Sequence, residues 1–159
     1  MIEIRSIQEE DDSDIATIIR ANLETYGLDI PGTAYFDPEL NHLSHYYLDE
    51  PEQKTYLIAV DDGQVIGGVG IARFDGFEHC AELQKLYVAD TAKGKGTGRR
   101  LLAEIQSSAR RKGYRRLYLE THSVLKSAIR LYERDGFVEI GKPDCVFHSA
   151  MDRFFMKNL

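Results

Sequence analysis

The 159-residue sequence predicts an α/β fold in which a mixed β-sheet has a parallel pair of strands near its centre. The first observation is a glycine loop at residues 93–98 (KGKGTG), which separates a strand-like run from a helix-like run. The second is the strand that follows this helix, because a strand–helix–strand connection lays its two strands parallel. The third is a hairpin signal at residues 61–63 (DDG), which adds antiparallel strands.

Apolar periodicity predicts the elements of the first half of the chain. A run that begins at Ser13 has apolar residues at helical spacing and ends near Gly27. Pro38 suits the first turn of a second helix, where no N–H donor is needed. In order, the expected elements are a strand over residues 2–7, a helix over 13–27, a helix that starts at 37, and strands over 55–60, 64–74 and 81–88.

The second half is predicted to alternate helices and strands. Gly113 and Gly136 each follow a run of helical spacing, where glycine readily adopts the left-handed conformation that ends a helix. In order, the expected elements are a helix that the glycine loop opens and that stops near residue 113, a strand over 114–121, a helix over 125–136, and strands over 137–140 and 145–156. No linker or repeat interrupts them, so residues 1–159 are expected to form one domain.

The glycine loop is a candidate phosphate site. Gly94, Gly96 and Gly98 leave main-chain N–H groups unshielded where the positive end of a helix dipole lies. Their spacing matches neither the GxGxxG of dinucleotide-binding folds nor the GxxxxGK[ST] of nucleoside triphosphatases. A different phosphate-bearing ligand is therefore expected.

The net charge of −6 conceals an uneven distribution. Residues 93–116 contain nine cations and one acid, whereas the other residues contain 11 cations and 25 acids. Nucleic-acid binding favours a broadly basic domain, so no nucleic-acid partner is expected, and the pattern fits a small polyanion held at one place. Alternatively, the five cations from Arg110 to Arg116 only solvate a helix end and a turn.

The sequence also argues against a secreted or membrane protein. Residues 1–14 lack the basic and apolar regions of a secretory signal, and no apolar run approaches the roughly 20 residues of a membrane span. Cys80 and Cys145 lie far apart, so buried, reduced thiols in a cytoplasmic protein are expected. No metal is expected either, because His42 and His45 have no acidic partner at a useful spacing.

The glycine loop and its surroundings resemble the acetyl-CoA-binding motif of the GNAT acetyltransferase superfamily. That motif reads [QR]xxGxG/A, between a strand that commonly ends in LYV and a helix that begins with LL. Here LYV at residues 86–88 precedes the loop at 93–98, and LL follows it. Residues 119–137 (LETHSVLKSAIRLYERDGF) resemble the family's next strand, its AxxLY helix and its closing GF turn. Lys93 departs from the usual Arg or Gln, and Leu125 replaces an asparagine often found there.

The resemblance implies a GNAT fold, with about six to seven strands in a mixed sheet, a splayed central parallel pair and about four helices. It implies an N-acetyltransferase that moves the acetyl group of acetyl-CoA to a primary amine of a small molecule or peptide, by direct transfer in a ternary complex. Neither cysteine belongs to the matched motifs, which argues against a covalent acetyl-enzyme. The residues implied to bind acetyl-CoA are Leu86, Tyr87, Val88, Lys93, Gly94, Lys95, Gly96, Thr97, Gly98 and Arg99, with the Val88 N–H against the thioester carbonyl.

Two catalytic side chains are implied as well. An alkylamine of pKa ~10.4 must lose a proton at an uphill cost of roughly 4.6 kcal/mol at pH 7, so a general base is needed. Glu82 is implied to be that base, and Tyr132 to protonate the departing CoA thiolate. Alternatively, Glu82 is a surface ion-pair partner and Tyr132 completes an apolar helix stripe. The other candidate bases are His79, His122 and His148.

The acidic body favours a cationic or amine-bearing acceptor, such as an amino acid, a polyamine, an aminoglycoside-like compound or a protein amine. The residues expected near the acceptor are Tyr26, Tyr35, Phe36 and His122, although the aromatic ones equally suit a small satellite core. The alternative functions are a non-catalytic acyl-CoA-binding regulatory module and an acyltransferase with a different acyl donor or acceptor. Family members are often dimers, so a homodimer is a further expectation.

Overall fold

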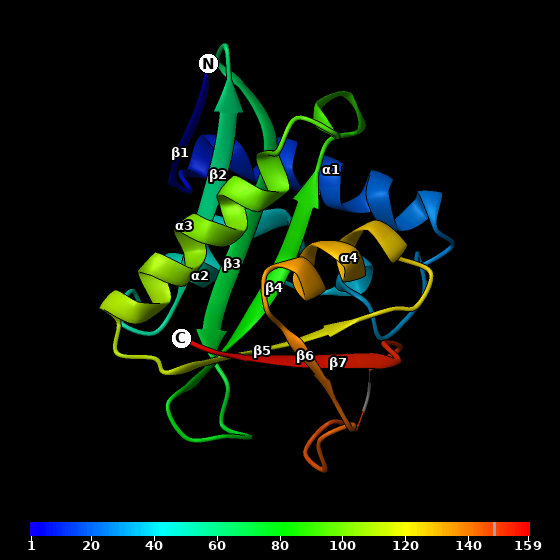
Figure 1. Ribbon diagram of the computed structural model, residues 1–159. Coiled ribbons are helices and arrows are strands. Elements are labelled where there is room, and N and C mark those ends of the chain that lie inside the picture. The colour runs from blue at the N-terminus through cyan, green and yellow to red at the C-terminus, as the bar shows by residue number, and fades with distance from the viewer. Residues whose placement is uncertain (148) are drawn as a thin grey trace.

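The computed structural model describes residues 1–147 and 149–159, whose strands form one seven-stranded sheet (Figure 1). The strands are β1 (Ile2–Ser6), β2 (Thr55–Asp61), β3 (Gln64–Arg73), β4 (Cys80–Val88), β5 (Arg116–Thr121), β6 (Val138–Ile140) and β7 (Arg153–Asn158). Their spatial order is β1-β2-β3-β4-β5-β7-β6. Neighbouring strands are antiparallel except β4 and β5, which are parallel, so the predicted mixed sheet is confirmed.

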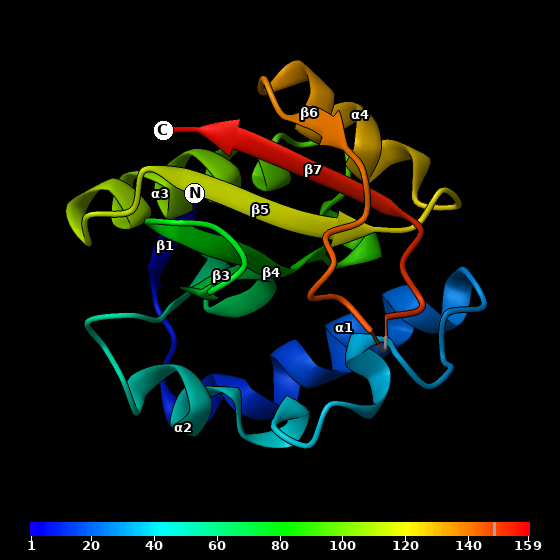
Figure 2. The same cartoon turned by 90° about the horizontal axis from the view of Figure 1, so that it is seen from below.

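Two pairs of helices cover the two faces of the sheet (Figure 2). The helices are α1 (Asp12–Thr25), α2 (Leu43–Leu48), α3 (Thr97–Arg111) and α4 (Lys126–Arg134). α1 and α2 pack on one face, where Ile15, Ile19 and Leu43 are fully buried. α3 and α4 pack on the other, and the apolar stripe of α3 is buried there. Burial on both faces explains why β2 (TYLIAVD) and β3 (QVIGGVGIAR) are almost continuously apolar.

The parallel pair is in contact over only a short distance. β4 pairs with β5 from Cys80 to Glu82, opposite Arg116 to Tyr118. Both strands then continue, and they diverge from each other, with α4 lying over the gap (Figure 1). β4 keeps its other neighbour, because it pairs with β3 as far as Val88. The second half of β4 is therefore a strand with one free edge inside the molecule.

Two predicted element boundaries are wrong. Residue 37 does not start a helix, because a residue before proline is driven to extended backbone, and Asp37 has φ −61° and ψ 130°. A 3-10 turn at Leu40–His42 leads instead into the shorter α2. The last strand begins at Arg153 rather than 145. Upstream of it, the Ala150 N–H donates to the Gly32 carbonyl, outside the sheet.

Gly70 on β3 is expected to tolerate no side chain. A Cβ atom there would lie 2.6 Å from Cδ2 of Tyr56 on β2 and 2.9 Å from Cζ of Tyr47 on α2, both of which are buried. Gly70→Ala should therefore lower the free energy of unfolding by about 2–3 kcal/mol, measured by urea denaturation. Gly141→Ala is the matched control, since no atom lies within 4 Å of the added Cβ, and it should change that free energy by less than about 0.5 kcal/mol. Equal effects of the two substitutions would contradict this packing.

Candidate active site

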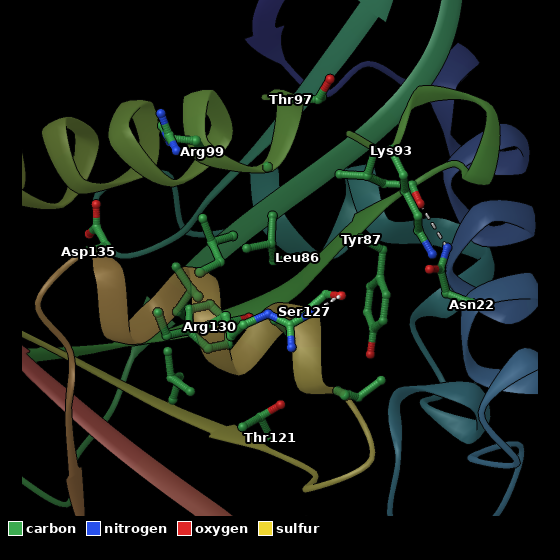
Figure 3. Close-up of a pocket in the computed structure, with 18 of the residues that line it drawn as sticks. Asn22, Leu86, Tyr87, Lys93, Thr97, Arg99, Thr121, Ser127, Arg130 and Asp135 are labelled. Atoms are coloured by element: carbon green, nitrogen blue, oxygen red, sulfur yellow. Dashed lines mark hydrogen bonds between the residues drawn. The ribbon is translucent and has the colours of Figure 1, made fainter. Parts of the chain in front are cut away.

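A cavity of about 710 Å³ opens where β4 and β5 separate. Its walls are the end of α1, the second half of β4, the glycine loop with the start of α3, the end of β5, and α4 (Figure 3). Apolar side chains such as Leu83, Leu119 and Leu131 line it together with several cations. This combination suits an elongated ligand that has both an apolar and an anionic part.

A β-bulge at Lys85 directs β4 along the cavity. The register with β3 shifts between Gly68 and Gly70, and Lys85 has a left-handed φ of 51°. The Lys85 carbonyl accepts a hydrogen bond of 2.8 Å from the Tyr56 hydroxyl. The buried ammonium group of the Lys85 side chain lies 2.7 Å from the carboxylate of Asp37 and 3.5 Å from that of Glu39. These contacts offset the strain of the left-handed backbone, and they attach the loop between α1 and α2 to the centre of the site.

Beyond the bulge, main-chain groups of β4 face the cavity. The Ala89 N–H donates to the Ile66 carbonyl on β3 at 2.8 Å. Because successive strand residues direct their main-chain groups to opposite edges, those of Val88 face away from β3, toward the opened edge. The same alternation applies to Leu86. Both residues line the cavity together with Tyr87.

The glycine loop presents free N–H groups at the start of α3. Gly94 and Gly96 have φ values of 80° and 79°, which favour glycine. The first turn of α3 begins with a bond from the Arg100 N–H to the Gly96 carbonyl at 3.0 Å. The N–H groups of the three residues between them therefore lie outside the helical ladder. Of the predicted loop residues, the cavity is lined by Lys93, Gly94, Gly96, Thr97, Gly98 and Arg99, and Lys95 is exposed outside it.

Cations surround the outer part of the cavity. Arg99 comes from α3 and Arg130 from α4 (Figure 3). Arg134 of α4 also lines the cavity. The Lys93 ammonium group is paired with Asp90 at 2.8 Å. The positive charges of the three arginines add to the positive end of the α3 dipole, so this part of the cavity is suited to several anionic groups.

Glu82 lies at the point where β4 and β5 separate. It is the last β4 residue paired with β5, and Gln84 links its side chain to Tyr47 of α2. Its carboxylate accepts a 2.9 Å bond from the Gln84 amide, which in turn accepts a 2.6 Å bond from the Tyr47 hydroxyl. Burial raises the pKa of Glu82 to about 7, the Gln84 bond opposes the shift, and the charge of Glu120 adds to it. Glu82 does not line the cavity itself, but Glu120 beside it does.

Tyr132 of α4 is a buried residue that lines the cavity. Its ring packs edge-on against Phe137 with centroids 5.8 Å apart, and the side chain is only 6% exposed. No hydrogen bond joins its hydroxyl to another described residue, and this hydroxyl is not fully enclosed, because among residues 1–147 and 149–159 only the Thr97 hydroxyl is a fully buried side-chain polar group without a partner. Burial, and secondarily the hydroxyl of Tyr87, raise the pKa of Tyr132. A tyrosine hydroxyl with access to a cavity is able to donate a hydrogen bond to a bound group.

The residues expected near the acceptor are dispersed. Tyr26 lines the cavity, but on the donor side, with its ring 5.9 Å from the Lys93 ammonium group. Tyr35 packs against the core under α1, and Phe36 is 58% exposed. His122 accepts a bond from the Val124 N–H and lies 3.8 Å from Asp152. His148 lies outside the described residues.

Among residues 1–147 and 149–159, no group of three or more His, Cys, Asp or Glu side chains converges as metal ligands do. The same residues contain no helix with the length and apolarity of a membrane span.

Cys80 is buried, which raises the pKa of its thiol to about 11. Cys145 is exposed, so the expectation that both thiols are buried is wrong.

The sequence analysis missed several residues of the cavity wall, which are Asn22, Glu120, Ser127, Arg130 and Arg134. The last three recur at helical spacing along α4, so a search for polar residues on one helix face would have found them. Asn22 interrupts the apolar stripe of α1 and is only 8% exposed. A buried asparagine in a helix is unfavourable without a partner, so an asparagine within an apolar helix stripe indicates a polar contact with another segment.

Comparison with known proteins assigns the family. Residues 19–137 match the model of the Acetyltransferase (GNAT) family. The chain belongs to this family. The GNAT acyltransferase is 38% identical over 139 residues to the uncharacterized N-acetyltransferase YjgM of Escherichia coli K12. The aligned residues cover 86% of this chain and 82% of YjgM. It is 34% identical over 106 residues to an IAA acetyltransferase of Azospirillum brasilense, spanning 67% and 69% of the two proteins.

Solved structures share the GNAT fold. An acetyltransferase of the GNAT family from Staphylococcus aureus superposes with a TM-score of 0.86 at 22% identity, covering 99% of both chains. The PaiA N-acetyltransferase of Thermoplasma acidophilum, solved in complex with coenzyme A, has a TM-score of 0.79 at 20% identity and covers 100% of this chain and 99% of its own. The predicted GNAT fold is therefore confirmed.

Thr97 at the start of α3 carries an energetic penalty. Its hydroxyl is buried, and no other described group bonds to it. Thr97→Val keeps the shape and removes the unsatisfied hydroxyl, so it should raise the free energy of unfolding of the unliganded GNAT protein by about 1 kcal/mol in urea denaturation.

Thr33→Val is the matched control for Thr97→Val. The Thr33 hydroxyl is also buried, but it donates to the Leu28 carbonyl at 2.8 Å and accepts from the Tyr35 N–H. The same substitution should therefore lower the free energy of unfolding by about 1–2 kcal/mol. A loss of similar size at both positions would show that Thr97 has a partner.

Proposed function

We propose that this chain is a single-domain, cytoplasmic enzyme that transfers the acetyl group of acetyl-CoA to a primary amine, directly and in a ternary complex. The observation that carries the proposal is the cavity at the separation of β4 and β5. A free strand edge, a glycine loop with free N–H groups and the Tyr132 side chain all line it. Each of these matches a different part of an acyl-CoA.

The cavity wall fits the donor from its phosphates to its thioester. The N–H groups of Thr97, Gly98 and Arg99 would hold the pyrophosphate at the start of α3, with the arginines of α4 nearby. The amide groups of pantetheine resemble those of a peptide strand, so they would pair with Leu86 and Val88 on the edge that β5 leaves free. The Val88 N–H would then polarise the thioester carbonyl.

Glu82 is proposed as the general base. An acceptor ammonium group must become a neutral amine before its nitrogen can attack the thioester carbon. A carboxylate with a pKa near 7 is well matched to accept that proton at neutral pH, either directly or through a water molecule. The bond from Gln84 orients the carboxylate, so that one of its oxygens remains available.

Tyr132 is proposed to stabilise the leaving group. As the new C–N bond forms and the C–S bond breaks, the electron pair moves to the CoA sulfur. The Tyr132 hydroxyl would donate a hydrogen bond to that sulfur. Because burial raises the pKa of Tyr132, donation of a hydrogen bond is favoured over complete transfer of the proton. The resulting thiolate, whose pKa is ~8.5, is stable enough to leave.

The charges around Glu82 support a cationic acceptor. Glu120 lies on the adjacent strand and accepts a 2.9 Å bond from the Tyr118 hydroxyl. Asp37 and Glu39 share the single charge of Lys85, which leaves this group net negative. An alkylammonium ion would therefore be attracted to this side of the sheet before Glu82 removes its proton.

The proposal is tested by incubating the purified protein with acetyl-CoA and a panel of primary amines. Release of free thiol together with an acetylated amine, identified by mass spectrometry, is the expected result. Binding of CoA in calorimetry without acetylation of any amine would favour the regulatory module, and absence of CoA binding would refute the proposal. Succinyl-CoA and malonyl-CoA in parallel would show whether the acyl group is acetyl.

Glu82→Gln should abolish the pH dependence of turnover near neutrality. In the wild-type protein, kcat should fall as the pH drops below about 7, because protonated Glu82 cannot accept a proton. The variant should lose about 10²–10³-fold in kcat and show no such limb, measured at saturating donor and acceptor. Glu104→Gln, on the exposed face of α3, is the control and should behave as wild type. A variant that keeps the limb would assign the base elsewhere.

Tyr132→Phe should lower kcat about ten- to hundredfold while the Kd for CoA stays within about twofold, because the ring packing is retained. Stopped-flow thiol release and calorimetry measure the two quantities. Tyr114→Phe is the matched control, since its hydroxyl donates to the Gln53 carbonyl at 2.7 Å, outside the cavity. It should lower stability without changing kcat. An unchanged kcat in Tyr132→Phe would remove this role.

A further inference from the structure

We infer that Asn22 of α1 is a positioning residue that fixes the Val88 peptide on which the donor would be held. Its side-chain nitrogen donates to the Val88 carbonyl at 3.1 Å, across a sequence separation of 66 residues (Figure 3). Asn22 lines the cavity without belonging to any of the matched motifs. The inference rests on the proposed function, because it assigns Asn22 a role in donor binding.

The Val88 carbonyl lacks a strand partner because β5 has diverged. Pairing between β4 and β5 ends at Glu82, and the carbonyl of Val88 faces the opened edge. A buried main-chain carbonyl needs a hydrogen-bond donor, and in a continuous sheet the next strand would provide it. Asn22 provides that donor from a helix instead. It is therefore a substitute for the missing strand at this one position.

Two further contacts hold the Asn22 side chain and the Val88 peptide in place. The same side-chain nitrogen donates to the Ile18 carbonyl one turn earlier, at 2.9 Å, so both hydrogens of the amide are used. The residue is 8% exposed, which limits the rotation of its side chain. On the other side of the peptide, the Ala89 N–H is bonded to Ile66 of β3. The peptide between residues 88 and 89 is thus held from α1 and from β3.

The position of this peptide matters for the donor. Val88 is the last residue of β4, and the chain turns at once into the 3-10 turn Asp90–Ala92 and the glycine loop. Fixing the Val88 carbonyl fixes the orientation of the residue that presents its N–H to the donor. It also leaves that N–H as the group of Val88 that is free for the donor, because the carbonyl is already occupied. Without Asn22, the carbonyl would take up cavity water, which donor binding would have to reorder.

Asn22→Ala and Asn22→Asp test this role, since each removes the donated hydrogen bond and the second keeps the shape of the side chain. Calorimetry should show CoA binding about five- to tenfold weaker in both. Steady-state kinetics should show a raised KM for acetyl-CoA and a lowered kcat, with the KM for the amine unchanged. In nitrogen-15 spectra, the amide resonance of Ala89, which shares the peptide group, should shift.

Thr25→Ala is the matched control on the same helix. The Thr25 hydroxyl donates only to the Ala21 carbonyl of α1, at 2.9 Å, and the residue is exposed. This variant should bind CoA as the wild type does. A general loosening of α1 would instead affect all three variants alike, and that result would contradict a specific role for Asn22.

The outcomes separate this inference from the proposed function. If the wild-type protein does not bind CoA, the proposed function fails, and the role of Asn22 fails with it. If the wild type binds CoA and the folded Asn22→Ala variant binds it equally well, only the role of Asn22 is refuted. Should neither variant fold, the side-chain amide resonances of Asn22 in the wild type give the answer. They should shift when CoA is added, and resonances that do not respond would overturn the inference.

Discussion

The separation of β4 from β5 is the constraint on which the rest of the site depends. The two parallel strands exchange hydrogen bonds only from Cys80 to Glu82, although both extend further. An unpaired strand edge inside a protein is unfavourable, because its main-chain groups need partners. The bulge at Lys85 and the hydrogen bond from Asn22 to the Val88 carbonyl hold β4 in this position, so the edge remains open.

The opened sheet also separates two kinds of electrostatic environment. The glycine loop and the arginines of α3 and α4 make one end of the cavity positive, which suits the phosphates of an acyl-CoA. Acidic residues gather on the opposite side, where burial and the neighbouring Glu120 raise the pKa of Glu82. Tyr132 lies at the cavity wall between α4 and the sheet. The two substrates of the proposed reaction would therefore approach from sides of opposite charge.

Local sequence predicted the elements well wherever local physics decides them. The glycine loop, the hairpin at residues 61–63 and the helix before Gly136 follow from turn chemistry and periodicity, and the structure confirms them. The predicted start of the second helix is wrong because Pro38 drives the residue before it to extended backbone. This effect outweighs the preference of proline for the first turn of a helix. Asn22 interrupts an apolar helix stripe and the arginines of α4 recur on one helix face, so the sequence carries a signal for both, but it does not show which distant segments they face.

The sequence by itself determined the family, the order of the elements and the position of the glycine loop, because each depends on residues that are close together in the chain. Only the tertiary structure decided how far β4 and β5 stay paired, how deeply Glu82 is buried, and which helix reaches the Val88 carbonyl. These depend on contacts between segments as far apart as residues 22 and 88. Long-range packing sets burial, and burial sets the pKa of a carboxylate and the need of a carbonyl for a partner.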